Sequence, residues 1–386
     1  QPDPEEGPVP VQFGLASPEY SVTTKSAGGL EKWNNTTLYV FGYDRTAEDF
    51  AEASATTLIY NVGAEAATGT EASLTVEHDV SEEGDDSVME PFYYEDGVNY
   101  DFYGYHIDDA AVDKTDPDGE PIPVVVPEEG TTVDGVDLTK GVYVKFHIEG
   151  SQDLMTAKAD PVVDVVGATE TVDPARAYSA YAARRGVQPT LTFQHQLARF
   201  KFRIRSGSES GNTVKVDSIK ILDQPADGYL KVVGLAEEEQ VITTFTPAEP
   251  AEALVDFVLQ QDDGAGSMKD LEPVSPIDQW PAEEPDATTT SNQVGESIMI
   301  VPGGSSCTIR IKTSQEGVTT SIPAQEYTIE AKNLTLEGEL LGDGAVFEAG
   351  KVYTITLVIY GPEKIEITAT LDPWEDGGSI EWDPDK

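Results

Sequence analysis

The sequence predicts an all-β protein with two β-sandwich domains in tandem and few short helices. Apolar residues occur at every second position in many short segments, which are rich in β-branched and aromatic residues, as half-buried strands are. Segments that favour helices are few and short. The chain of 386 residues is too long for one ordinary sandwich, whereas about seven strands in each half suit two sandwiches.

The composition excludes several classes of function. The formal net charge is −47, from 24 lysines and arginines against 71 aspartates and glutamates. Nucleic acid and anionic membrane surfaces both attract basic proteins, so neither is an expected partner. Hydrophobic residues make up 39% of the chain, which is enough for real cores. No run of about 18 apolar residues, the length of a membrane-spanning helix, is present.

The first strand lies near the beginning of the sequence. Residues 1–8 are rich in proline and acid and read as an extended tether, of the kind expected after a removed export signal. The inward side chains of the strand alternate with polar or small residues, and they are Val9, Val11, Phe13 and Leu15. A polar, glycine- and serine-rich stretch that contains Lys25 and Lys32 separates this strand from the next, residues 38–44.

Five more strands are expected in the first half, at residues 57–62, 72–78, 91–97, 100–107 and 142–148. Residues 108–135 carry many turn signals and read as a loop. Asp173 is a suitable N-cap for a helix that begins at Pro174 and ends at Arg185, with Gly186 as its terminator. We place the boundary between the two domains just after this helix.

The second half opens with residues 190–205, TLTFQHQLARFKFRIR. Leu191, Phe193 and His195 share one phase, whereas Phe200 and Phe202 share the other, so the phase changes near Ala198. A bulge or bend there would keep both apolar faces inward. The remaining strands are expected at 216–223, 228–233, 254–260, 296–303, 306–313 and 325–334, and residues 270–292 form an acidic, proline-rich loop.

The clearest alternation of the whole chain lies in residues 350–374. Two strands joined by the turn GPEK (361–364) form a hairpin, and the inward residues of its second strand are Ile365, Ile367, Ala369 and Leu371. An apolar strand this close to the end of the sequence must be covered by its own fold or by another molecule, because an exposed strand edge invites pairing.

Nothing in the sequence singles out a catalytic or metal site, and no cofactor is expected. The four histidines are not paired at the spacing of metal ligands, and His195, in the apolar phase of its strand, reads as a satisfied core residue. The single cysteine, Cys307, lies in a strand-like segment and reads as a buried, inert thiol. With so many carboxylates, a general acid and base cannot be distinguished from chance neighbours.

An aromatic cluster in residues 92–105 allows two interpretations. Aromatic faces can stack on sugars, which makes Tyr93, Tyr94 and Tyr103 candidate glycan contacts. Tyr100 and Phe102, however, alternate with polar or small residues as core strand residues do, and core packing is the favoured interpretation.

Four stretches together resemble the fimbrillin family of Bacteroidales, the subunits of type V pili. They are residues 100–106 (YDFYGYH), 153–157 (DLMTA), 190–205 and 350–378, and they follow one another in the order found in the family. The resemblance implies two transthyretin-like β-sandwich domains. It also implies export as an outer-membrane lipoprotein precursor, whose lipidated cysteine would precede Gln1, and assembly into extracellular fimbriae.

The resemblance further implies a mechanism of assembly. A trypsin-like surface protease would cleave after a basic residue, here Lys25 or alternatively Arg45, and release the N-terminal strand Val9–Leu15. The donor strand Ile365–Leu371 of another copy, or of a related pilin, would then fill the vacated groove. From the residues alone, both strands carry the same alternation, so one can replace the other on a single ladder.

We therefore predict a non-enzymatic pilus subunit, of the shaft type rather than the tip, that serves adhesion to a target the sequence does not identify. Residues 1–25 form the tether and removable strand, 26–187 the N-terminal domain and 188–386 the C-terminal domain with its donor strands. The alternative is a surface-exposed glycan-binding lipoprotein of the same fold, which would be a monomer without processing at Lys25.

Overall fold

The computed structural model describes most of the chain, and every structural statement below refers to that part. The described residues are 7–16, 21–23, 26–30, 36–44, 59–66, 72–81, 88–108, 121–159, 178–184, 186–234, 242–244, 254–264, 267–276, 293–336 and 339–372.

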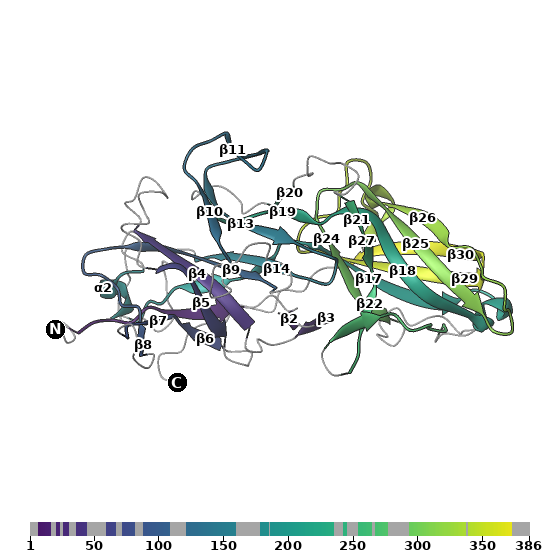
Figure 1. Ribbon diagram of the computed structural model, residues 1–386, viewed down its shortest axis with the longest axis horizontal. Coiled ribbons are helices and arrows are strands. Elements are labelled where there is room, and N and C mark those ends of the chain that lie inside the picture. The colour runs from purple at the N-terminus through teal and green to yellow at the C-terminus, as the bar shows by residue number, and fades with distance from the viewer. Residues whose placement is uncertain are drawn as a thin grey trace.

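The protein is almost entirely β-structure, which confirms the predicted all-β class, and it is elongated, with the two halves of the chain at opposite ends (Figure 1). Three sheets form the N-terminal half. Sheet I has the order β15 (Thr190–Thr192), β1 (Gln12–Ala16), β6 (Ala72–Thr75). Sheet II has the order β16 (Gln194–His195), β14 (Leu154–Lys158), β9 (Tyr100–Ile107), β4 (Thr36–Asp44), β5 (Ile59–Ala66). Sheet III has the order β10 (Pro123–Val126), β13 (Gly141–His147), β19 (Asp227–Val233), β20 (Ile242–Thr244).

Two larger sheets form the C-terminal half. Sheet IV has the order β24 (Gln293–Ile300), β17 (Ala198–Ser206), β29 (Val352–Gly361), β30 (Lys364–Asp372), β27 (Thr335–Leu336), β28 (Glu339–Leu340). Sheet V has the order β21 (Leu254–Val258), β18 (Val214–Pro225), β25 (Ser306–Gln315), β26 (Gln325–Glu330). Buried side chains from both sheets belong to one core, so these sheets pack face to face as a sandwich.

Four small hairpins complete the strands. They are β2 (Ser21–Thr23) with β3 (Ser26–Leu30), β7 (Glu77–Asp79) with β8 (Met89–Pro91), β11 (Thr131–Val133) with β12 (Val136–Leu138), and β22 (Gln260–Asp262) with β23 (Met268–Asp270). The helical segments are α2 (Ala180–Ala183) and the 3₁₀ turns η3 (Glu209–Thr213) and η5 (Ala331–Asn333).

The predicted helix from Pro174 to Arg185 is wrong in its described part. Tyr178 has a φ of 56°, a left-handed conformation that no continuous right-handed helix contains. The helix α2 begins only after Ser179, whose side chain caps the first turn by accepting from the backbone N–H of Ala182. Gly186 does follow the helix with a φ of 81°, as predicted for its terminator.

Two other expectations also differ from the structure. The expected strand 91–97 is irregular after Pro91, with one bridge between Tyr93 and Pro10 and a turn at residues 96–97. The expected loop 108–135 contains β10 and most of the hairpin β11–β12. Asp134 and Gly135 both have positive φ in that hairpin, and an Asp-Gly pair is a known signal for such a turn.

Sheet II is the middle layer of the N-terminal half, because its two faces belong to two different cores. One face packs on sheet I through residues such as Val40 and Phe102. The other face, with Phe41 and Tyr105, joins the core that continues through sheet III into the C-terminal half. The hydroxyl of Tyr103 donates to the carbonyl of Gly234 at 3.0 Å, which ties sheet II to the end of β19.

The predicted phase change in residues 190–205 marks the crossing between the halves. Leu191 and Phe193 are buried in the core beneath sheet I, whereas Phe200 and Phe202 are buried in the C-terminal core. β15 and β16 therefore pair with N-terminal strands although they follow residue 188, and β19 pairs with β13. The domain boundary at residue 188 stays a prediction, as does the transthyretin-like character of the sandwiches.

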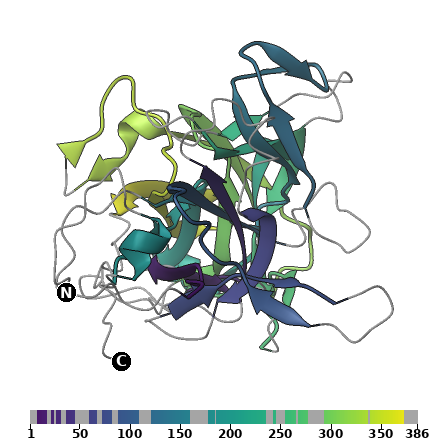
Figure 2. The same cartoon turned by 90° about the vertical axis from the view of Figure 1, so that its left-hand side faces the viewer.

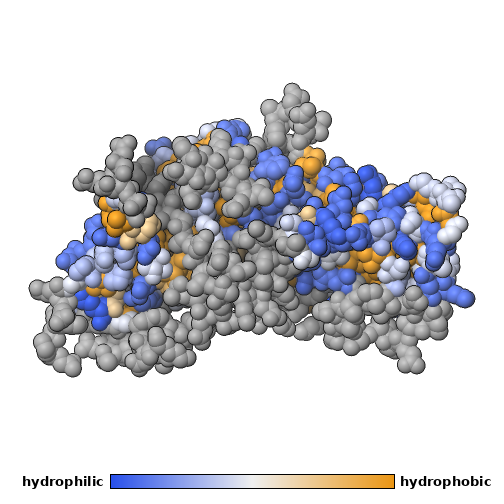
Figure 3. Space-filling model, turned by 60° about the horizontal axis from the view of Figure 1, so that its bottom comes forward, coloured by the Kyte–Doolittle hydropathy of each residue, from blue (hydrophilic) through white to orange (hydrophobic). Residues whose placement is uncertain are grey.

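The face of the molecule drawn in Figure 3 is largely polar where it is described. In Figure 3, hydrophilic side chains cover most of the described part of that face, and hydrophobic areas are small and interrupted. Within the described part of the chain, no helix has the length and apolar character needed to cross a membrane.

Candidate functional site

Strand β1 lies in the middle of sheet I, between two strands that come from distant parts of the sequence. It pairs antiparallel with β6, where Phe13 lies opposite Leu74, and parallel with β15, where Leu15 lies opposite Leu191. Figure 2 shows the molecule from the end at which the N-terminal half lies. A middle strand has both of its edges in ladders, so removing β1 would leave two unpaired strand edges.

The residues before β1 are also held by backbone hydrogen bonds. The N–H of Val11 donates to the carbonyl of Phe92 at 2.7 Å, and the N–H of Tyr94 donates to the carbonyl of Val9 at 2.9 Å. One guanidinium nitrogen of Arg184 donates to the carbonyl of Gly7 at 3.0 Å. The held segment therefore begins at Gly7, before the strand proper.

Three of the four predicted inward side chains are completely buried, whereas the first, Val9, is partly buried. Val11 and Leu15 are 0% exposed and Phe13 is 1% exposed. The ring of Phe13 meets that of Phe102 edge to face, with 5.0 Å between ring centroids. We call the space that these three side chains fill the β1 groove; its apolar walls come from Leu38, Val40, Leu74, Val76, Phe102, Leu191 and Phe193.

Two of the three predicted aromatic contacts are part of the cores, Tyr94 in the core of the β1 groove and Tyr103 in the core on the other face of sheet II. Tyr94 and Tyr103 are each 5% exposed, so their ring faces are covered in the folded chain. Burial raises the pKa of Tyr94 well above its ordinary value, and the neighbouring hydroxyls of Tyr178 and Tyr100 raise it further. Only Tyr93 of the three candidate glycan contacts keeps partly exposed surface. The core-packing interpretation is therefore confirmed for Tyr94 and Tyr103.

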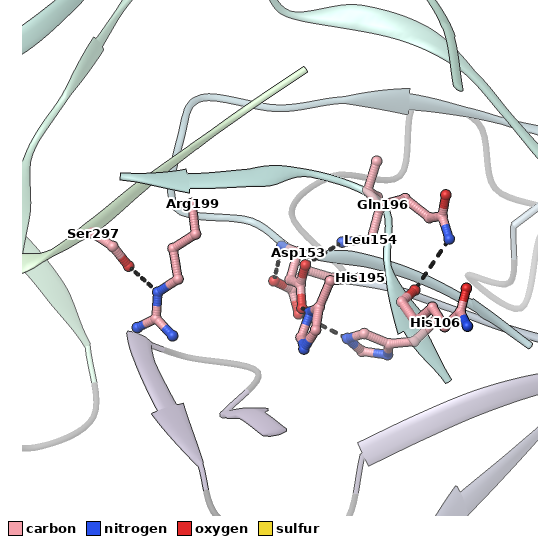
Figure 4. Close-up of polar contacts among 9 residues, drawn as sticks. His106, Asp153, Leu154, His195, Gln196, Arg199 and Ser297 are labelled. Carbon is pink, nitrogen blue, oxygen red and sulfur yellow. Dashed lines mark hydrogen bonds and ion pairs between the residues drawn. The ribbon is translucent and has the colours of Figure 1, made fainter. Parts of the chain in front are cut away.

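A buried polar cluster joins neighbouring strands within sheet II (Figure 4). The Nδ1 atom of His195 donates to the carboxylate of Asp153 at 2.6 Å. The backbone N–H of Asp153 donates to Asp108 at 2.8 Å, and Nε2 of His106 lies 3.1 Å from the other oxygen of Asp108. These contacts join β16, β14 and β9 at one point.

The charges in this cluster favour a protonated His106. Burial alone lowers the pKa of His106, but the hydrogen bond and negative charge of Asp108 outweigh burial and raise that pKa above its ordinary value. The carbonyl of Thr37 and the charge of Asp153 act in the same direction. His195 is 3% exposed and hydrogen-bonded, so the prediction that it is a satisfied core histidine is confirmed.

The two aspartates of this cluster were not singled out by the sequence. Asp153 directly precedes β14 and Asp108 directly follows β9, which places both at strand ends that meet in sheet II. Further along the chain, Arg199 is buried at the start of β17, and its Nε donates to Ser297 at 2.9 Å (Figure 4). Asp108, Asp153 and Arg199 share one feature that is visible in the sequence: each is a charged residue at the end of an apolar strand.

The predicted donor strand is β30, and it is not free in this structure. It pairs antiparallel with β29 along its whole length, from Lys364 opposite Gly361 to Asp372 opposite Val352. On its other side it meets β27 only where Thr370 lies opposite Thr335. Ile365 is buried, whereas the remaining inward residues of the strand, Ile367, Ala369 and Leu371, are only partly buried.

Both predicted processing residues, Lys25 and Arg45, lie outside the described residues. In the sequence, Lys25 falls between β2 and β3, and Arg45 directly follows β4. Residues 373–386, which follow β30, also lie outside the described part of the chain.

The described residues offer no site for metal or thiol chemistry. No group of three or more histidine, cysteine or acidic side chains among them is arranged to hold a metal ion. Cys307 is buried, as predicted, and burial raises the pKa of its thiol to about 12, which makes the reactive thiolate scarce near neutral pH.

The chain belongs to the fimbrillin-like family, because the family model matches residues 28–374. Solved structures to which the chain is similar include a putative cell adhesion protein from Bacteroides uniformis (15% identity, 95% of this chain and 99% of that chain covered, TM-score 0.44). Another putative cell adhesion protein, from Bacteroides ovatus, shows 14% identity over 96% of this chain and 99% of that chain, with a TM-score of 0.45.

A third solved structure is the tip fimbrial protein Mfa3 from Porphyromonas gingivalis with a C-terminal truncation. It shows 8% identity over 95% of this chain and 100% of that chain, with a TM-score of 0.32. No curated protein matches the chain. Since all three TM-scores lie below 0.5, membership of the family rests on the family model.

Proposed function

We propose that this protein is a non-enzymatic structural subunit of a type V pilus that serves cell adhesion at the cell surface. Subunits join when β30 of one copy, or the matching strand of a related pilin, replaces β1 of the next. The observation that carries this proposal is the position of β1. A strand near the beginning of the sequence is the middle strand of sheet I and supplies three fully buried side chains.

The burial of β1 explains why the intact subunit stays closed. Fully burying an apolar side chain stabilises by roughly 1.5–3 kcal/mol, so Val11, Phe13 and Leu15 together contribute roughly 5–9 kcal/mol before ordering costs. While β1 belongs to the same chain, any strand from another molecule must compete with a covalently attached one. Cleavage between β1 and β4 removes that advantage, because a released strand is diluted.

β30 has the properties of a replacement strand. Its inward residues follow the same period of two as those of β1, and three of them are only partly buried in sheet IV. Moving them into the β1 groove would complete their burial. The transfer also uncovers the edge of β29. Contacts in the β1 groove must therefore stabilise β30 more than its contacts in sheet IV do.

A pair of substitutions in β30 tests the role of this strand. Ile367 points inward and is partly exposed in the intact subunit, whereas its neighbour Thr368 points to solvent. Ile367→Glu would carry a charge into the β1 groove and should abolish polymer formation after low-dose trypsin treatment, as seen by size-exclusion chromatography. Thr368→Glu, the matched control, should leave assembly close to that of the parent. Equal assembly of both variants would contradict the donor role.

Processing after Lys25, or alternatively Arg45, by a trypsin-like surface protease is part of the same proposal. Cleavage after Lys25 separates β1 from β4 and the rest of the chain, whereas cleavage after Arg45 would separate β1 together with β4. N-terminal sequencing of the trypsin-treated protein tests it: a new N-terminus at residue 26 is expected, residue 46 would indicate the alternative, and protection of both bonds would contradict the proposal.

We also propose that the precursor is an outer-membrane lipoprotein with two transthyretin-like domains that meet near residue 188. The family supports this proposal. Incorporation of labelled palmitate into the precursor in its source cell tests the lipid anchor, and an unlabelled precursor would contradict it.

A further inference from the structure

The β1 groove contains one large site and two smaller ones. Phe13 fills the large site and packs edge to face on Phe102 with 5.0 Å between ring centroids. The smaller side chains of Val11 and Leu15 fill the sites on either side of Phe13, and none of the three is more than 1% exposed. Protein interiors leave few voids, so a strand that replaces β1 must present large side chains where β1 has them.

β30 cannot match these sites in an arbitrary register. Its inward residues are Ile365, Ile367, Ala369 and Leu371, and Ala369 is the smallest of them. A shift by one residue would turn all four to the solvent side, so the register changes only in steps of two. The place of Ala369 in the groove therefore distinguishes the available registers.

If β30 runs in the direction of β1, each register meets an obstacle. In what we call the direct register, Ile365 takes the place of Val9 and Leu371 that of Leu15. This register puts Ala369 in the large site of Phe13 and leaves a void. A shift by two residues puts Ala369 in the site of Leu15, which is also fully buried. The opposite shift puts Pro373 in the site of Leu15, where β1 pairs with strands on both sides, and a proline there cannot donate to the ladder.

The opposite direction removes these obstacles in one register. Ile367 then fills the site of Phe13, and Ile365 fills the site of Leu15. Ala369 replaces Val11, the smallest of the three buried side chains, which leaves the least space empty. Shifting this register by two residues puts either Ala369 in the site of Phe13 or Glu363 in that of Leu15, so only one reversed register fits.

The site of Gly14 gives an independent argument for the same direction. A Cβ atom added at Gly14 would lie 3.3 Å from Oγ1 of Thr190, which is closer than an ordinary contact. In the direct register Thr370 takes this place, and in the reversed register Glu366 does. A threonine is branched at Cβ and crowds Thr190 more than the unbranched glutamate.

We infer that the partner's β30 enters the β1 groove antiparallel to the strand that it replaces, with Ile367 in the site of Phe13 and Ala369 in the site of Val11. This inference rests on the proposed function and adds the direction and register of the incoming strand. The two directions exchange the places of Ile367 and Ala369, so they are separable by experiment.

A reciprocal pair of substitutions exploits that exchange. In the reversed direction, Ile367→Phe restores the aromatic side chain of the large site and should assemble at least as fast as the parent after trypsin treatment. Ala369→Phe would overfill the site of Val11 and should assemble roughly tenfold more slowly. The reverse ranking would overturn the inferred direction. Circular dichroism of the untreated variants checks that both are folded.

Cysteine pairs provide a second test that does not depend on volume. Thr190→Cys in the acceptor should form a disulfide with Glu366→Cys in the donor, because both would occupy facing positions. In the reversed register Thr370 lies four residues, or about 13 Å, along the strand from that position, beyond the reach of a disulfide. Glu366 and Thr370 are both exposed in β30, so these changes should not disturb the intact subunit. The native thiol, Cys307, is buried.

A third cysteine pair separates this inference from the proposed function. Thr368 would take the place of Gln12 in either direction, opposite Thr75 of β6. The pair Thr75→Cys and Thr368→Cys should therefore cross-link whenever exchange occurs, as detected by mass spectrometry of peptides from the polymer. If this cross-link forms and Thr190→Cys cross-links with Thr370→Cys instead of Glu366→Cys, the inferred direction is wrong, although the donor role of β30 stands. Polymers that contain none of the three cross-links would contradict the donor role of β30 and the inference with it.

Discussion

Strands β1 and β30 carry the same apolar alternation, yet their surroundings differ. β1 pairs with β6 from Gln12 to Leu15 and with β15 from Gly14 to Ala16, and the inward side chains Val11, Phe13 and Leu15 are fully buried. β30 has a full ladder only with β29, and beyond Ile365 its inward side chains are partly buried. The period of a strand determines which side chains share a face, but its neighbours determine how much that face contributes to stability.

The largest expected effect distinguishes the two strands directly. Phe13→Ala should lower the free energy of unfolding by about 3–5 kcal/mol, because it leaves a cavity in a closed core. Ile367→Ala in β30 should cost only about 1–2 kcal/mol, because the side chain is already partly exposed. Chemical denaturation of both variants measures the difference. Equal costs would mean that the two strands are buried alike.

Two glycines extend the comparison to the surroundings of each strand. A Cβ atom at Gly104 would lie 2.9 Å from the ring of Phe193 in the wall of the β1 groove, so Gly104→Ala should cost about 1–3 kcal/mol. Gly361, at the turn that leads into β30, has open space around it, so Gly361→Ala should change stability by less than about 0.5 kcal/mol. Thermal unfolding of the pair provides the measurement, and a neutral Gly104→Ala would contradict the close packing of this wall.

The polar cluster within sheet II predicts a smaller, pH-dependent effect. Folding raises the pKa of His106, so protonation of His106 stabilises the folded state. This contribution to the free energy of unfolding is complete below about pH 6.5 and is lost as the pH rises through the raised pKa. The free energy of unfolding should fall by up to about 1.4 kcal/mol per pH unit in that window. Urea titrations of the parent and His106→Gln should show a shallower slope for the variant. Identical slopes would exclude His106 as the source.

The smallest expected effect concerns the encounter of subunits rather than either strand. Copies with a net charge of −47 repel one another, and salt screens this repulsion. The rate of assembly after trypsin treatment should therefore rise about two- to tenfold between low and physiological ionic strength. Light scattering follows this rate directly. A rate that falls with added salt would indicate that attraction between opposite charges guides the encounter.

Local patterns were enough to predict much of the fold. The alternation in residues 100–107 and 350–372 predicted β9, β29 and β30, and the phase change near Ala198 coincides with the crossing from one core to the other. The hairpin at Asp134 was missed although its Asp-Gly turn signal is present, because prolines and acids around it favoured a loop.

Other features depend on contacts that no local pattern contains. The pairing of β19 with β13 joins the two halves of the chain, and the period of β19 is compatible with any apolar partner. The same holds for the cluster around His106, whose partners Asp108 and Asp153 meet only after sheet II has formed. The helix before Gly186 was predicted too long because the left-handed conformation of Tyr178 has no signature in the sequence.

The account depends most on the claim that β1 is a removable strand whose loss turns a monomer into an acceptor. The direct measurement is the mass of the trypsin-treated protein by size-exclusion chromatography with light scattering, for the parent and for Lys25→Ala. The account predicts that the parent loses β1 and forms polymers, while Lys25→Ala stays a monomer at the same trypsin dose. A parent that loses β1 and remains monomeric, or a Lys25→Ala variant that polymerises as readily with β1 still attached, would contradict it.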